Sequence, residues 1–143
     1  MASSTPVLID TSVWIDALRG RTPSLLAGVR ELLAADRARR CDVVTAELRA
    51  GLRGHERAGF LEWFDAVPNL SVELRDWEQA GDLARSLRAR GLTVPLTDLL
   101  VATLSLRHDV PVWTLDHHFD AVEGLRRHPE PQPSVTRPRR ARR

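Results

Sequence analysis

Lysine is absent from this sequence of 143 residues, and arginine supplies all 21 of its basic side chains. Without lysine the chain cannot form a Schiff base, place a Walker-type lysine on a phosphate or use a lysine general base. Tyrosine is absent too, which excludes a phenolic nucleophile. Arginine remains available for phosphate, because its planar guanidinium can bind two oxygens at once. A biased genome composition would also explain the preference for arginine.

Cysteine and long apolar runs are scarce. Cys41 is the single cysteine, so no disulfide can form within the chain, which favours a cytoplasmic protein. The longest apolar stretches are far shorter than a membrane-spanning helix, and residues 1–6 show no signal-peptide pattern. The length suits one domain with its own core. We therefore expect a single cytoplasmic domain without a membrane segment.

Charge is unevenly distributed along the chain. Residues 129–143 contain four prolines, five arginines and one glutamate, whereas the remainder has slightly more acids than arginines. Because such a composition cannot pack a core, we predict a folded domain over residues 1–128 and a disordered basic tail over 129–143. The tail would either contact RNA without sequence preference or have no measurable role.

Within the folded part, strand-like apolar runs alternate with helical patterns. The runs predicted as strands are 7–9, 41–44, 70–74 and 111–115. The segments predicted as helices are 13–19, 23–33, 46–53, 55–67, a long helix through Trp77 that ends at Gly91, 98–108 and a short one after Asp116. This alternation predicts a three-layer α/β/α sandwich with a mainly parallel sheet of four to five strands. The four tryptophans fit core positions better than a base-stacking platform.

Four acids lie where strands end or helices begin. Asp10 and Asp116 end apolar strands, and Asp98 begins a helix that is apolar nearly all round. Glu47 lies in the first turn of the helix predicted after the second strand. Since ligands in such folds bind beyond the carboxyl ends of the strands, these positions can converge. Four convergent carboxylates repel one another, and a divalent cation reverses that effect.

The ligand chemistry indicates Mg²⁺, with Mn²⁺ able to substitute, because both ions accept carboxylate oxygens. Such an ion activates water and stabilises the leaving oxygen, which suits hydrolysis of a phosphodiester bond. We predict that Asp10 and Asp98 form the core of the direct metal shell. Asp116 would bind directly or through water, and Glu47 would either bind a second ion or orient the attacking water.

Each acid also has a simpler explanation. Asp10 and Asp98 can cap the helices that follow them, and Glu47 can complement a helix dipole. Asp116 can form a turn after its strand. The occurrence of all four at such positions favours a shared site.

Several neighbours of these acids are candidate supporting groups. Ser12 and Thr114 can hold a carboxylate or a metal-bound water, although capping would also explain Ser12. His117 and His118 can shuttle protons or touch phosphate, but a solvent-facing pair at a helix start is the preferred interpretation. Asp16 is predicted to be a surface charge.

Four segments that contain the acids resemble the motifs of PIN-domain proteins and occur in the order of that family. The last follows a T-x-D-x-x-F pattern, although His117 stands where another acid is frequent in the family. The segments are Val7–Ile15, Thr45–Gly51, Thr97–Ala102 and Thr114–Phe119. Together they extend the resemblance over nearly the whole folded part.

The small size most resembles the VapC-type toxins of bacterial toxin–antitoxin pairs. That resemblance implies a Mg²⁺-dependent endoribonuclease that acts on structured RNA such as tRNA or rRNA. It also implies a homodimer and inhibition by a small cognate antitoxin of the VapB type.

Two rival functions fit parts of the pattern. A phosphotransferase with an aspartyl-phosphate intermediate, like a receiver domain, usually needs a lysine that this chain lacks. A catalytically silent PIN-like module that binds RNA or protein predicts loss of at least one acid, whereas all four are present. An active nuclease is therefore the expected function.

Overall fold

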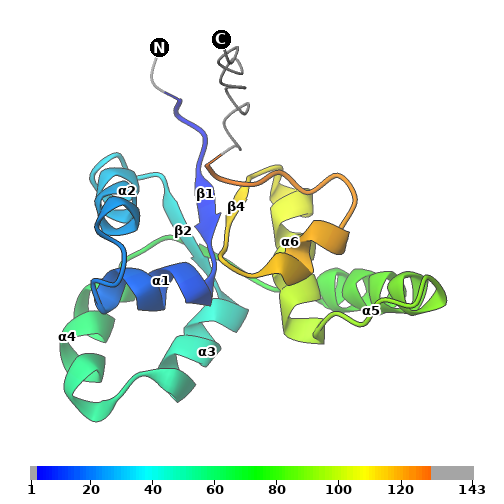
Figure 1. Ribbon diagram of the computed structural model, residues 1–143, viewed down its shortest axis with the longest axis horizontal. Helices are drawn as coiled ribbons and strands as arrows, with labels where there is room; N and C mark the ends of the chain where they lie inside the picture. Colours follow the sequence, from blue (N-terminus) through cyan, green and yellow to red (C-terminus); the bar gives the residue numbers. More distant parts are fainter. Residues whose placement is uncertain (1–2, 130–143) are drawn as a thin grey trace, which may run out of the picture.

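The computed structural model describes residues 3–129 and shows a sheet with helices on either side (Figure 1). The predicted tail, 129–143, lies outside the described residues except for Pro129. The elements in chain order are β1 Val7–Ile9, α1 Thr11–Leu18, α2 Pro23–Ala34, β2 Ala38–Cys41, α3 Asp42–Gly51, α4 Gly54–Phe64, β3 Asn69–Leu70, α5 Leu74–Ala89, α6 Leu96–His108, β4 Val112–Trp113 and the 3₁₀ helix η1 His117–Ala121.

The four strands run parallel in the order β3-β2-β1-β4, which confirms the predicted α/β sandwich. Leu8 pairs with Arg39 of β2 on one side and with Val112 of β4 on the other. Because β1 and β4 are parallel neighbours, their carboxyl ends meet at the same edge. Asp10 and Asp116, which follow these two strands, are therefore brought to that edge.

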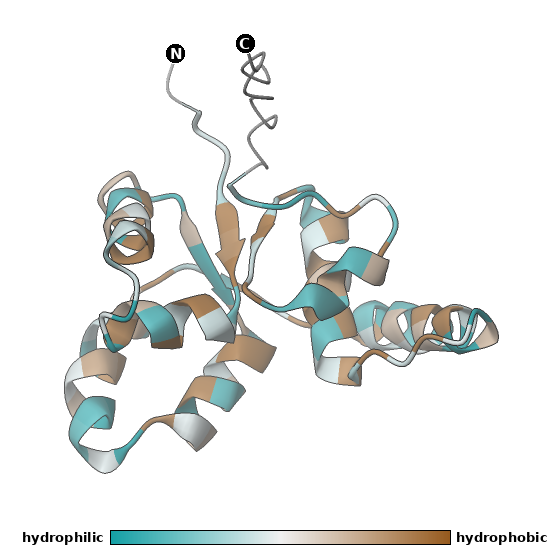
Figure 2. Cartoon of the chain, in the orientation of Figure 1, coloured by the Kyte–Doolittle hydropathy of each residue, from teal (hydrophilic) through white to brown (hydrophobic). Residues whose placement is uncertain are grey.

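The strand β1 and the helix α6 are buried at the centre of the molecule. All three residues of β1 are fully buried, and they form an apolar arrow in the middle of Figure 2. A parallel strand covered on both faces has no polar side, which explains its continuous apolar sequence. Residues 99–105 of α6 are buried without interruption, as the sequence predicted. Within residues 3–129, no helix combines the length and the apolar character needed to cross a membrane.

The predicted position of the second strand is wrong. The strand is Ala38–Cys41 instead of 41–44, and α3 begins at Asp42. Val44 and Leu48 are buried on α3 because residues four apart share one helical face, and Val43, next to Val44, is buried as well. Arg40 can lie in this strand although it is polar, because its guanidinium group donates hydrogen bonds to the backbone carbonyls of Val67 and Asp65.

Two further predictions differ from the structure. The third strand covers only Asn69–Leu70, and Leu74 opens α5 because the backbone N–H of Glu73 donates to Asp76 Oδ2 at 2.8 Å, as at a helix start. The tryptophan prediction holds for Trp14 and Trp113, which are buried. It is wrong for the other two, Trp63 and Trp77, which are exposed on α4 and α5.

Candidate active site

Asp10 is buried at the end of β1 and is held by two hydroxyl groups. Ser12 Oγ and Thr114 Oγ1 each donate to Asp10 Oδ2 at 2.9 Å. Asp10 occupies the N-cap position of α1, but its side chain makes no capping hydrogen bond. The structure therefore brings Ser12 and Thr114 to Asp10, and capping does not explain this carboxylate.

Asp98 lies inside the first turn of α6. The helix begins at Leu96 with Pro95 as its N-cap, so the explanation of Asp98 as a helix cap is wrong. Proline suits this position because its φ is fixed, and because the helix does not need a backbone N–H from the residue that precedes it. Asp98 Oδ2 instead lies 2.9 Å from His118 Nδ1.

Asp116 forms a turn and also faces the other acids. Its Oδ1 accepts a hydrogen bond from the backbone N–H of His118 at 2.9 Å, which starts η1. Its own N–H donates to Thr114 Oγ1 at 3.0 Å, the hydroxyl that donates to Asp10. The turn explanation is thus correct for Asp116, and the same turn connects it to Asp10.

Glu47 lies in the second turn of α3, not in the first turn as predicted, because the helix begins at Asp42. Its side chain is half-buried, and Thr11 Oγ1 donates to Oε1 at 3.4 Å. The four predicted acids, with Asp16 and Arg21, line one cleft of about 330 Å³. The structure therefore brings all four acids together from separate parts of the chain.

The cleft concentrates negative charge. Burial raises the pKa of Glu47, and the charges of Asp10 and Asp98 raise it further. Burial also raises the pKa of Asp98, the hydrogen bond with His118 opposes that shift, and Asp10 adds to it. These shifts mark carboxylates that lack sufficient positive charge nearby. A donor set of carboxylate oxygens with one imidazole fits a divalent cation.

We expect Glu47→Gln to stabilise the metal-free protein at neutral pH. Because the pKa of Glu47 is raised in the folded state, the folded protein binds this proton more tightly than the unfolded chain. The stability of the wild type therefore falls as pH rises from the ordinary pKa of glutamate through the raised value. The gain of the variant should be absent below this window and complete above it, with melting temperatures rising about 2–4 °C for each kcal/mol.

Thermal unfolding of both proteins across pH, with a chelator present, measures this difference. Glu62→Gln, at an exposed acid of α4, serves as the matched control and should change the curve little. A variant less stable than the wild type at neutral pH would contradict the electrostatic account of the cleft.

Asp16 was missed as a member of the cleft, and its prediction as a surface charge is wrong. Its side chain is only 9% exposed, and Thr22 Oγ1 donates to its Oδ2 at 3.2 Å. Among residues 3–129, no donor lies within hydrogen-bond distance of its Oδ1. Asp16 follows Ser12 by four residues, and this spacing places both on one face of α1. That spacing was the signal that could have found it.

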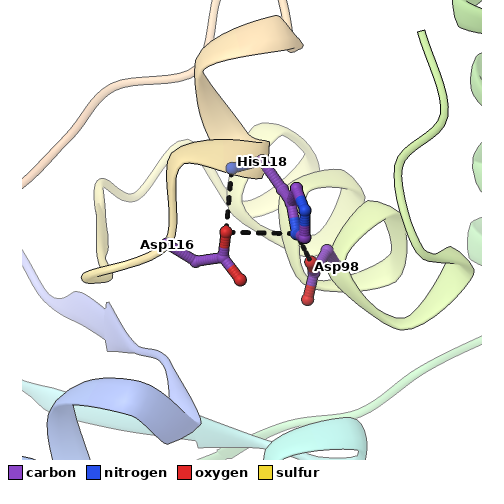
Figure 3. A group of neighbouring side chains, drawn as sticks. All are labelled: Asp98, Asp116 and His118. Carbon is purple, nitrogen blue, oxygen red and sulfur yellow. Dashed lines mark hydrogen bonds and ion pairs between the residues drawn. The ribbon is translucent and has the colours of Figure 1, made fainter.

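The two histidines after Asp116 differ in position. His117 is 92% exposed and, among residues 3–129, its side chain pairs with Asp120 alone, as predicted for a solvent-facing residue. His118 is also exposed, as predicted, but its Nδ1 lies 2.9 Å from Asp98 and 3.1 Å from Asp116 (Figure 3). The hydrogen bond with Asp98 raises the pKa of His118.

Cys41 can be excluded as a nucleophile. Its side chain is fully buried, and this burial raises the pKa of its thiol to about 12. A thiol protonated at neutral pH is not nucleophilic. The chemistry available at this edge of the sheet is therefore that of the carboxylates and His118.

Comparison with known proteins agrees with this geometry. A family model described as PIN domain matches residues 7–125. The chain belongs to the PIN-domain family. VapC ribonuclease Mb1587 of Mycobacterium bovis and ribonuclease VapC11 of Mycobacterium tuberculosis are each 31% identical over 124 residues, 83% of this chain and 92% of the relative. Within the PIN-domain family, the chain is thus of the VapC type.

Several solved structures share the fold. VapBC2 from Rickettsia felis, bound to a DNA fragment from its promoter, superposes with a TM-score of 0.72 at 18% identity, over 85% of this chain and 96% of the other. FitAcB from Neisseria gonorrhoeae gives 0.71 at 21% identity, over 86% and 97%. VapBC-5 from Mycobacterium tuberculosis is 29% identical, with a TM-score of 0.62 over 87% and 94%.

Proposed function

We propose that this protein is a Mg²⁺- or Mn²⁺-dependent endoribonuclease and the toxin of a type II toxin–antitoxin pair in the cytoplasm. The observation that carries the proposal is the convergence of Asp10, Glu47, Asp98 and Asp116 on one cleft. The names of the curated relatives, VapC ribonucleases, support RNA as the substrate.

The proposed roles follow the contacts of each acid. Asp10 and Asp98 form the core of the metal-binding set, and Ser12 and Thr114 fix the orientation of Asp10. Asp116 binds directly or through water. Glu47 either binds a second ion or orients the attacking water, and its raised pKa suits a group that exchanges protons.

A divalent ion bound there supplies Lewis acidity and neutralises charge on the scissile phosphate. Arg21, the cationic residue of the cleft, contributes attraction to the RNA backbone. The acids exclude phosphate from the cleft unless a cation is present, since like charges repel in a partly buried site. Substrate binding in the cleft is therefore coupled to metal binding.

A small antitoxin and a second copy of the chain are the proposed protein partners. The antitoxin is supported by the solved neighbours, among which VapBC-5 is described as a member of the VapBC family of toxin–antitoxin systems. The homodimer and the choice of tRNA or rRNA rest on the resemblance to VapC toxins.

Incubation of the purified protein, free of antitoxin, with total cellular RNA tests the function. Cleavage is expected with Mg²⁺ or Mn²⁺, to be absent with a chelator, and to leave 5′-phosphate ends. Sequencing of the new ends identifies the target. RNA binding without cleavage under either metal would refute the enzyme and favour a silent RNA-binding module.

A further inference from the structure

His118 lies against the two acids at the outer side of the cleft. Its Nδ1 is 2.9 Å from Asp98 Oδ2 and 3.1 Å from Asp116 Oδ1, and the three side chains point toward one another in Figure 3. One ligand atom from each of the three residues lies within 4.8 Å of the other two. Asp98 and Asp116 also line the cleft that contains Asp10, so they connect His118 to the other acids.

This position is fixed by the turn that follows β4. Asp116 Oδ1 accepts the backbone N–H of His118 at 2.9 Å, and η1 begins at His117. The turn directs the imidazole of His118 back toward α6, while His117 extends into solvent. His118 is 48% exposed, so the group can bind a ligand without rearrangement of the core.

A proton on Nδ1 can satisfy only one of the two carboxylates with good geometry. Nδ1 carries at most one hydrogen, and that hydrogen can point well at only one of the two carboxylates. Asp116 Oδ1 already accepts the backbone hydrogen bond of the turn. A cation between the three groups would instead attract both carboxylates and the nitrogen lone pair. Adjacent ligands of an octahedral ion at about 2.1 Å are about 3.0 Å apart, close to the two separations from Nδ1.

We propose that His118 is a nitrogen ligand of the metal ion, together with Asp98 and Asp116, and that it makes this nuclease prefer Mn²⁺ to Mg²⁺. This inference rests on the metal dependence proposed above. Mg²⁺ is a hard ion that favours oxygen ligands, whereas imidazole binds first-row transition ions more readily. An added nitrogen therefore strengthens Mn²⁺ binding more than Mg²⁺ binding.

Pulsed electron paramagnetic resonance of the full protein with Mn²⁺ alone tests the ligand directly. The wild type is expected to show hyperfine coupling from a directly bound ¹⁴N nucleus, which His118→Ala removes. His117→Ala is the matched control, because this neighbouring histidine contacts neither Asp98 nor Asp116, and it should keep the signal. Bound Mn²⁺ without nitrogen coupling in the wild type would overturn the proposal.

Affinities for Mn²⁺ and Mg²⁺, measured by titration without RNA, provide a second readout. His118→Ala is expected to weaken Mn²⁺ binding by at least about tenfold, in the range seen when support around a metal site is removed, and Mg²⁺ binding by less. If His118 were only a protonated counter-ion of the two acids, the same variant would strengthen the binding of both ions equally. That outcome would refute the ligand role even where folding is intact.

The two proposals fail in distinguishable ways. If the wild type binds Mn²⁺ and Asp98→Asn abolishes that binding, the proposed metal dependence stands whatever His118→Ala does. If the wild type binds neither ion, the metal dependence fails together with the ligand role. Thermal unfolding of each variant without metal confirms that the compared proteins are folded.

Discussion

Asp98→Asn is expected to reduce RNA cleavage by a factor on the order of 10³, the effect seen when a group that stabilises transition-state charge is lost. The asparagine has the same shape but is neutral, so the fold around α6 should be preserved. In the wild type, the carboxylate of Asp98 faces three other acids and His118, and burial and the charge of Asp10 raise its pKa. Loss of this charge therefore removes a proposed metal ligand and relieves repulsion at the same time.

RNA binding and cleavage should separate in this variant. With less negative charge in the cleft, affinity for RNA without metal is expected to be unchanged or higher than that of the metal-free wild type, whereas turnover with metal is lost. Asp10→Ala should lose turnover to a similar degree, and it leaves the hydroxyls of Ser12 and Thr114 without their shared acceptor. Asp82→Asn, at an exposed acid of α5, is the control that should cleave normally.

Single-turnover cleavage with metal, and binding by anisotropy with a chelator present, both with the same RNA, measure the two effects. Cleavage by Asp98→Asn at the rate of the wild type would remove this acid from the proposed machinery. Equal loss of binding and cleavage would indicate damage to the fold instead, which the melting temperature of the variant would reveal.

The convergence of Asp10, Asp98 and Asp116 could be predicted because it follows from the strand order and from the burial of one apolar helix. Asp10 and Asp116 follow strands that are parallel neighbours, and parallel strands end at one edge. Asp98 lies in the first turn of α6, a helix so apolar that it is buried in the centre of the molecule. These features depend on local patterns and on a small number of general rules, so one sequence is sufficient.

The parts that could not be predicted depend on contacts between distant residues. The strand β2 contains Arg39 and Arg40, and it forms because Arg40 reaches a carbonyl of Val67, 27 positions away. The orientation of His118 toward Asp98 and Asp116 depends on a turn whose backbone geometry is not encoded by residue type alone. Asp16 shows the same limit, since its burial requires the Thr22 hydroxyl at the start of the next helix.

Trp14→Ala is expected to be among the most destabilising single changes in the fold, at about 3–5 kcal/mol. The indole is 1% exposed and lies edge-on to Phe64, with ring centroids 5.2 Å apart. Its Nε1–H donates to the backbone carbonyl of Ile9 at 2.9 Å. The variant would therefore lose a large apolar side chain and leave a buried carbonyl without this donor.

Trp77→Ala provides the comparison, because this indole is 51% exposed on α5 and should cost well under half as much. Urea unfolding of both variants measures the difference, and equal losses would contradict the burial of Trp14. Trp14→Phe separates the two contributions, since it retains an aromatic ring but loses the N–H, at about 1 kcal/mol for the hydrogen bond. Because Ile9 directly precedes Asp10, this bond joins α1 to the end of β1 where the proposed metal-binding acids begin. Trp14→Phe is therefore expected to weaken metal binding more than its small effect on stability would suggest.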